Sequence, residues 1–159
     1  MADISDAVGV SHLIVYRHFA SKEQLYEAVI ERAHAHLDAK LAAGGMGRFG
    51  PSPATLLRIV RSDPPGFVVL WRHAAREPEF RRLHDRSRQR LVDLTMEAMR
   101  PHVAKRDRAW AARATVTYLV EATVAWLDDG DPRLDDRFVA ATDSALRAGI
   151  RSWSATRRS

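Results

Sequence analysis

The segment from Ile4 to Lys22 constrains this chain more than any other, because it fits two very short helices, a turn and the start of a third helix. Apolar residues recur at helical spacing before Gly9, which stands where a left-handed residue would end the first helix. Ser11 is a favourable N-cap for a second helix that runs from His12 to about His18. A unit of this size is too small for a catalytic cleft but fits a DNA groove, so we interpret it as a helix-turn-helix.

The second helix carries most of the side chains that we expect to contact DNA. Val15 and Phe19 lie four residues apart and form its buried side, so its other faces remain free for the duplex. Polar and basic side chains suit phosphate oxygens, and apolar ones suit thymine methyl groups. The expected phosphate contacts are Ser11, which is also the helix cap, Tyr16, His18 and Lys22. The expected base-edge contacts are His12, Leu13, Ile14 and Arg17.

A capping box follows, with Ser21 as the cap and Gln24 at the third helical position. The apolar stripe after it predicts a long helix from Lys22 to Leu41. The positive amino end of this helix would lie near the duplex. We therefore expect it to join the DNA-binding head to the rest of the chain.

The motif elements in this region are Gly9-Val10-Ser11, then Val15-Tyr16-Arg17-His18-Phe19, then Ser21-Lys22. On these residues the segment resembles the DNA-binding domain of TetR/AcrR-type bacterial transcriptional regulators. The resemblance covers about the first quarter of the chain. It implies a repressor that dimerises through its last two long helices and is released from DNA when a small molecule enters a cavity in the body.

One departure from the family pattern concerns the start of the chain. Proteins of this type carry roughly two dozen residues before the motif, which form a basic arm and a first helix that covers the other two. This chain starts at Met1, inside the expected entry to the second helix. We expect it to be a shortened form, produced either by a start assigned at an internal valine codon or by design. A native mass equal to that of 159 residues would contradict the first of these explanations.

Composition narrows the class of protein. A chain of 159 residues with 46% hydrophobic content is long enough for one domain with a buried core. No apolar run approaches the roughly 20 residues that cross a bilayer, and no signal-peptide pattern is present, so we expect a cytoplasmic protein with no membrane partner. The absence of cysteine excludes disulfides and thiolate chemistry. The net charge of +5 favours a polyanionic partner.

The histidines and carboxylates do not predict a metal or catalytic site. Glu31 and His34 form one Glu-x-x-His spacing, but bundle di-iron sites need two copies and further glutamates. His34 and His36 point to different sides of a helix and make a poor metal pair. No nucleophile triad, paired-carboxylate motif or Gly-rich phosphate loop is recognisable. We therefore expect no enzyme activity, no metal and no cofactor.

The rest of the chain shows helical periodicity without an alternating strand pattern, so an all-α fold is predicted. Residues 43–53 are rich in Gly and Pro and read as a linker. The predicted division is a head with its linking helix at 1–42 and a ligand-binding and dimerisation body at 52–159. Helices are expected over 53–61, 64–76, from Pro78 to before Pro101, over 108–127 and over 134–153. The expected caps are Ser52 for the first of these helices, Asp63 for the second and Asp107 for the fourth.

The last two predicted helices, about 108–127 and 134–153, are apolar on more than one face. One body cannot bury all of these side chains. The small residues of the last helix would allow another helix to approach closely, which favours a homodimer through a four-helix bundle. Such a dimer would set two recognition helices about 34 Å apart on a near-palindromic operator in double-stranded DNA.

The expected effector site lies in the body. Its candidate residues combine aromatic, apolar and polar groups on helices expected to surround a cavity, although core packing is the more frequent role of such residues. They are Phe67, Trp71, Leu94, Thr117 and Glu121. The effector itself is an unknown small molecule.

Two functions from different classes agree with these features. The first is a TetR-like DNA-binding regulator, a repressor released by its effector. The alternative is a ligand-binding helical dimer that cannot bind DNA because its first helix is missing. An enzyme ranks third, because no catalytic constellation is recognisable.

Overall fold

The computed structural model describes residues 21–43, 46–47 and 50–155, with Lys22, Met46, Ser154 and Ala155 described by their backbone alone. The described part consists of helices and one very short hairpin, which confirms the predicted all-α class. Residues 1–20, which include most of the predicted DNA-binding head, lie outside the described residues.

Helix α3 spans Lys22–Ala42, in agreement with the predicted linking helix. The hydroxyl of Ser21 accepts a hydrogen bond from the backbone N–H of Gln24 at 3.2 Å, which confirms Ser21 as the cap. At the other end, the N–H of Ala43 donates to the carbonyl of Ala39. One face of α3 is buried along most of its length, so this helix is fixed to the body over several turns.

A hairpin follows α3 where the sequence predicted a linker. Strand β1, Met46–Gly47, pairs antiparallel with β2, Gly50–Pro51. Gly50 and Pro51 are buried, and β2 packs on helix α6, Arg81–Met99. Strand β2 at the end of this connection is therefore part of the packed body.

Local capping sets the starts of the next two helices as predicted. Helix α4, Pro53–Ser62, begins where the Ser52 hydroxyl accepts from the N–H of Thr55 at 3.1 Å. Helix α5, Pro64–Val68, begins where the Asp63 carboxylate accepts from the N–H of Gly66. The predicted continuation of this helix to residue 76 is wrong, because a π-helix, η1, takes over at Val69–His73.

Two later helix starts were also predicted wrongly. Helix α6 begins at Arg81, not at Pro78, because the buried Phe80 ring holds the preceding turn against the core. Helix α7 spans Lys105–Asp129 and has Ala104 at its N-cap, so Asp107 lies inside the first turn. A 3-10 turn, η2, at Pro132–Leu134 leads into α8, Asp135–Ala155.

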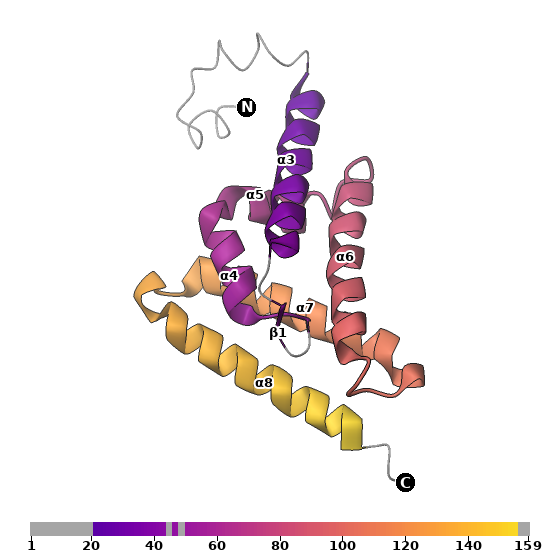
Figure 1. The fold of residues 1–159 in the computed structure, drawn as a ribbon. Helices are drawn as coiled ribbons and strands as arrows, with labels where there is room; N and C mark the ends of the chain where they lie inside the picture. Colours follow the sequence, from indigo (N-terminus) through magenta and orange to yellow (C-terminus); the bar gives the residue numbers. More distant parts are fainter. Residues whose placement is uncertain (1–20, 44–45, 48–49, 156–159) are drawn as a thin grey trace.

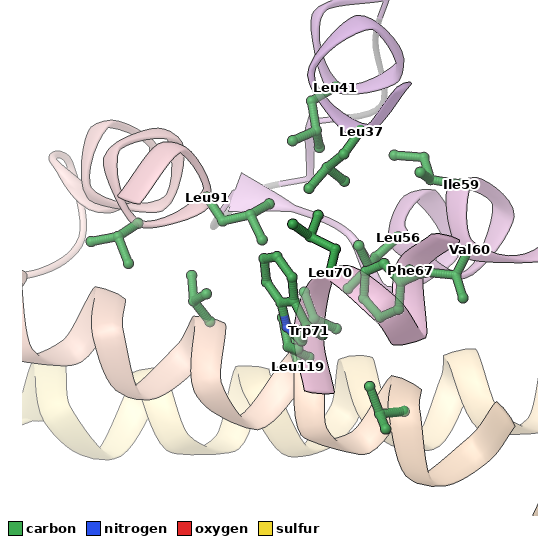
Figure 2. Close-up of a cluster of buried hydrophobic side chains, with 14 of the residues drawn as sticks. Leu37, Leu41, Leu56, Ile59, Val60, Phe67, Leu70, Trp71, Leu91 and Leu119 are labelled. Atoms are coloured by element: carbon green, nitrogen blue, oxygen red, sulfur yellow. The ribbon is translucent and has the colours of Figure 1, made fainter. Parts of the chain in front are cut away.

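Figure 1 shows how these elements are arranged. Helix α3 stands between α5 and α6, and α7 and α8 cross beneath them (Figure 1). One hydrophobic core joins all the long helices, and Figure 2 shows part of it. Its fully enclosed members include Ile30 of α3, Leu56 of α4, Leu70 of η1, Leu91 of α6 and Ala112 of α7. Among the described residues, no helix has both the length and the apolar character needed to cross a membrane.

Gly50 is the one described residue with positive φ, at 115°. A Cβ atom at this position would lie 2.6 Å from the Thr95 hydroxyl oxygen and 3.0 Å from the Thr95 Cα atom. Both the backbone conformation and the closeness of α6 therefore require glycine here. The hairpin can press against α6 only because this residue has no side chain.

We expect Gly50→Ala to lower the free energy of unfolding by about 1–3 kcal/mol, because it combines backbone strain with overlap at Thr95. Urea denaturation measures the change. Gly149→Ala on α8 is the matched control, because a Cβ there would meet only the Trp153 ring at 3.7 Å. The control should be neutral or stabilising by about 0.5–1 kcal/mol, since alanine is the better helix former. Equal stability of the two variants would contradict this account of Gly50.

Candidate functional site

The predicted DNA-contact residues are described only at their carboxyl end. Seven of them lie outside the described residues: Ser11, His12, Leu13, Ile14, Tyr16, Arg17 and His18. Lys22 is the first residue of α3, and its backbone alone is described. Its place in the first helical turn, directly after the Ser21 cap, fits a residue presented at the positive end of a helix.

A cleft of about 230 Å³ lies beside this amino end of α3. Glu23 and Tyr26 line it from α3, and His73, Glu77, Glu79 and Phe80 line it from the connection that leads to α6. The Tyr26 and Phe80 rings are 5.6 Å apart. The sequence did not predict this cleft, because its two sides, residues 23–26 and 73–80, are far apart along the chain. Its lining suits a hydrogen-bond donor or cation, although no group of His, Cys, Asp or Glu in the described part could hold a metal ion.

Two of the predicted effector residues come together in the structure. Phe67 of α5 and Trp71 of η1 are buried, and their rings stack with centroids 5.3 Å apart. Figure 2 shows both rings inside the core, among leucine side chains. The ring of His84 on α6 lies against Trp71 in a T-shaped arrangement, with the ring centroids 5.4 Å apart. Phe67 also lines a void of only about 10 Å³, which holds about one water molecule.

The other three predicted effector residues lie farther out. Leu94 of α6 is half-buried against the core. Thr117 of α7 is exposed and accepts a hydrogen bond from Arg88 at 2.8 Å. Glu121, one turn along, is also exposed. The structure thus brings the two aromatic residues together in the core and leaves the polar pair on the outer side of α7.

A polar contact joins α3 to α6 within this region. Nδ1 of His34 lies 2.6 Å from the hydroxyl oxygen of Ser87, which is fully buried. Nε2 of the same ring lies 3.8 Å from the Asp38 carboxylate. This order of hydroxyl, imidazole and carboxylate resembles a nucleophile arrangement, but Ser87 has no exposed surface at which a substrate could bind. The contact therefore fixes the position of α3 on α6.

Comparison with known proteins identifies the amino-terminal segment. Residues 1–29 match the family described as bacterial regulatory proteins, tetR family. This match covers only the amino-terminal segment of the 159-residue chain, and it supports a relation to tetR-family regulators. The matched segment ends inside α3, so this helix carries both the end of the family segment and the start of the body. No curated protein and no solved structure matches the chain significantly.

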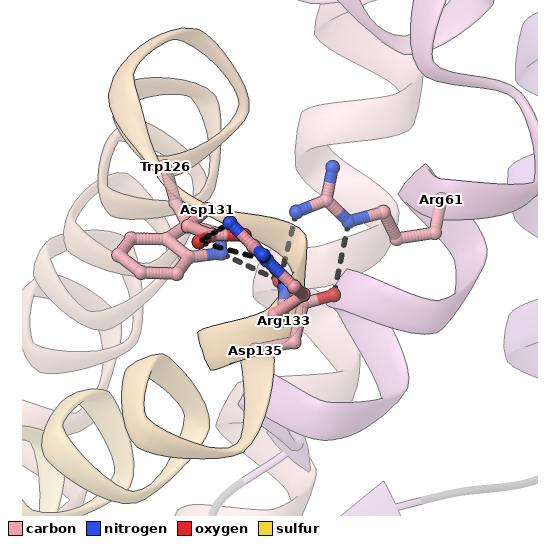
Figure 3. Close-up of polar contacts among 5 residues, drawn as sticks. All are labelled: Arg61, Trp126, Asp131, Arg133 and Asp135. Atoms are coloured by element: carbon pink, nitrogen blue, oxygen red, sulfur yellow. Dashed lines mark hydrogen bonds and ion pairs between the residues drawn. The ribbon is translucent and has the colours of Figure 1, made fainter.

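A charged contact anchors the turn between α7 and α8 (Figure 3). The Arg61 guanidinium at the end of α4 donates two hydrogen bonds to Asp135, at 2.8 and 3.0 Å. Trp126 of α7 donates its indole N–H to the same carboxylate at 2.7 Å, and its ring stacks on Phe138. The Arg61 bonds, aided by the Trp126 bond, hold the pKa of Asp135 below its usual value. Three helices therefore meet at one carboxylate.

The outer side of the same helices exposes apolar surface. Trp110 and Tyr118 of α7 and Leu134 of η2 are the large hydrophobic residues exposed in the described part, each at 44%. Trp110 meets Trp153 near the end of α8, with ring centroids 5.1 Å apart.

We expect Asp135→Asn to lower the free energy of unfolding by about 1–2 kcal/mol at neutral pH, because the paired charge is lost. The difference should be pH-dependent. Since the folded-state pKa of Asp135 is lowered, its stabilisation is present above the unfolded pKa of about 3.9 and is lost as the pH falls through the lower folded value.

Urea denaturation at a series of pH values between neutral and acidic measures this difference. The matched control is Asp136→Asn, which changes the exposed neighbouring residue on α8. This control should change stability little at any pH. A difference between wild type and Asp135→Asn that persisted unchanged into the acidic range would contradict the ion-pair account.

Proposed function

We propose that this chain is a TetR-family transcription regulator, a repressor that binds a near-palindromic operator as a homodimer and leaves it when a small molecule binds the body. The observation that carries the proposal is the double role of α3. Its first turns belong to the matched family segment, and its later turns are buried in the core of the body. A shift of the core therefore moves the amino end of α3, and with it the DNA-binding head.

The proposed DNA contacts are those predicted from the sequence. Lys22 binds a phosphate from the first turn of α3, where the helix dipole adds positive potential. The recognition helix before it reads base edges through residues such as Ile14 and Arg17. A protein that works on chromosomal DNA in this way acts in the cytoplasm of a bacterium.

We expect Lys22→Ala to weaken binding to the DNA upstream of the regulator's own gene, and to weaken binding to unrelated DNA in the same proportion. Each lost phosphate contact lowers the slope of log affinity against log salt by about 1, so a dimer should lose about 2. Fluorescence anisotropy over a salt series measures both quantities.

The matched control is Lys40→Ala, which removes an exposed lysine from the last turn of the same helix. It should leave the salt slope unchanged. A slope equally unchanged in Lys22→Ala would exclude the phosphate contact. The absence of binding by the 159-residue chain, together with binding by a form extended at its amino end, would instead favour the ligand-binding dimer without DNA binding.

The proposed dimer forms through α7 and α8. The exposed Trp110 and Tyr118 supply apolar area on α7. On α8, the exposed Ala141, Ala145 and Ala148 follow helical spacing and allow the backbone of a second α8 to approach closely. The Arg61 contact with Asp135 holds these two helices in one orientation, which suits a surface that must pair with its own copy.

We expect Ala145→Arg to convert the dimer into a monomer, because a long charged side chain would separate the two copies of α8. Sedimentation velocity measures the change. Ala35→Arg makes the same substitution at an exposed position on α3, and it should leave the dimer intact. Dimers of equal stability in both variants would contradict the α7–α8 interface.

The proposed effector acts on the packing between α3, η1 and α6. Phe67 and Trp71 lie in this region, and the π-helix that carries Trp71 is a local irregularity of the kind often found at functional positions. A ligand that separates these rings would change the surface on which α3 rests. Thr117 and Glu121 then serve as polar contacts at the outer end of the site.

A further inference from the structure

A second small cavity lies away from the proposed effector region. It has a volume of about 90 Å³ and is lined by described residues of the hairpin, the amino end of α4, and helices α7 and α8. Thr115 of α7 and Asp143, Leu146 and Arg147 of α8 contribute side chains to its lining. The volume is several times that needed for one water molecule and is near that of a very small organic molecule.

The Thr115 hydroxyl has no hydrogen-bond partner in the described part of the protein, although the residue is only 4% exposed. Thr123, two turns further along α7, provides the comparison. Its hydroxyl is also buried, but it donates to the carbonyl of Leu119 at 2.7 Å. Leaving a buried hydroxyl unpaired costs free energy, and Thr115 does so at the wall of a cavity. A guest in the cavity would give this hydroxyl its missing partner.

The one basic side chain in the described lining, Arg147, is the group that would bind an anionic guest. Nε of Arg147 donates a hydrogen bond to the Asp143 carboxylate at 2.6 Å. This bond does not use the two terminal nitrogens of the Arg147 guanidinium. Pro53 at the amino end of α4, a helix of 10 residues, forms another part of the wall; it contributes the positive potential of the helix end but no N–H donor. A planar guanidinium edge matches a carboxylate in shape and charge. The single acidic group, Asp143, is already bonded to Arg147.

We propose that this cavity binds the carboxylate group of a small organic acid or amino acid. The carboxylate lies between the terminal nitrogens of Arg147 and the Thr115 hydroxyl, at the amino end of α4. The apolar side chain of Leu146 covers the short hydrocarbon part of the guest. A bound acid would link the connection after α3 to the two carboxyl-terminal helices. The site does not depend on the proposed repressor function.

The test uses the full 159-residue chain without DNA and follows its thermal unfolding during titration with sodium acetate. A guest of four heavy atoms binds weakly, with a dissociation constant on the order of 1 mM. Binding to the folded state raises the melting temperature in a saturable way. Sodium chloride at equal ionic strength and acetamide, the neutral isostere, should give no saturable rise. Glycine distinguishes an amino acid from a simple acid.

Two variants test the named contacts separately. Thr115→Val keeps the side-chain shape and removes the unpaired hydroxyl, so the free protein should be at least as stable as wild type. Arg147→Gln removes the charge at a surface position. Each should weaken the response to acetate about tenfold or abolish it. The matched controls, Thr123→Val and Arg151→Gln, should respond to acetate as wild type does.

Three results would overturn the proposal. The first is an equal response to acetamide, which would exclude recognition of the charge. The second is an unchanged acetate response in both Thr115→Val and Arg147→Gln. The third is the absence of any saturable response in wild type. DNA binding of the same preparation, measured separately, shows whether the regulator function stands or fails independently of this site.

Discussion

The burial of one face of α3 in the common core is the constraint on which the rest of the arrangement depends. Ile30, Leu37 and Leu41 are enclosed by side chains from α4, η1 and α6, so the linking helix is a structural part of the body. Removing it would expose the inner faces of three other elements. The same helix begins inside the segment that matches the tetR-family model, so its first turns belong to that segment and its later turns to the core.

The position of strand β2 is fixed for a related reason. Gly50 brings the hairpin against Thr95 of α6 at a distance that no other residue allows. The carboxyl end of α3 is thus held from two sides, by its own buried face and by the chain that leaves it. Near its amino end, α3 contacts the connection at 73–80 as well, because the Tyr26 and Phe80 rings lie 5.6 Å apart beside the cleft lined by Glu23.

The sequence predicted those features that local physics decides. Ser21, Ser52 and Asp63 cap helices as expected, because a cap needs only a side-chain oxygen and the next few backbone N–H groups. The predicted start of α6 was wrong because it depends on the burial of Phe80, which is determined by tertiary packing and not by local sequence. For the same reason the cleft near α3 and the cavity beside Thr115 had no signal in the sequence. Each is lined by elements that are distant along the chain, and hydrophobic periodicity does not predict which distant elements come into contact.

Two histidines on α3 show that polar contacts fix the orientation of a helix whose apolar face is already buried. His34 and His36 point to different sides of the helix, as their spacing requires, and each meets a serine. His34 meets Ser87 of α6 at 2.6 Å, and His36 meets Ser62 of α4 at 2.8 Å. Apolar contacts are non-directional and permit a helix to slide or rotate slightly, whereas hydrogen bonds fix register and rotation. The two contacts therefore define one orientation of α3 between α4 and α6, and a change in that orientation must break or replace at least one of them.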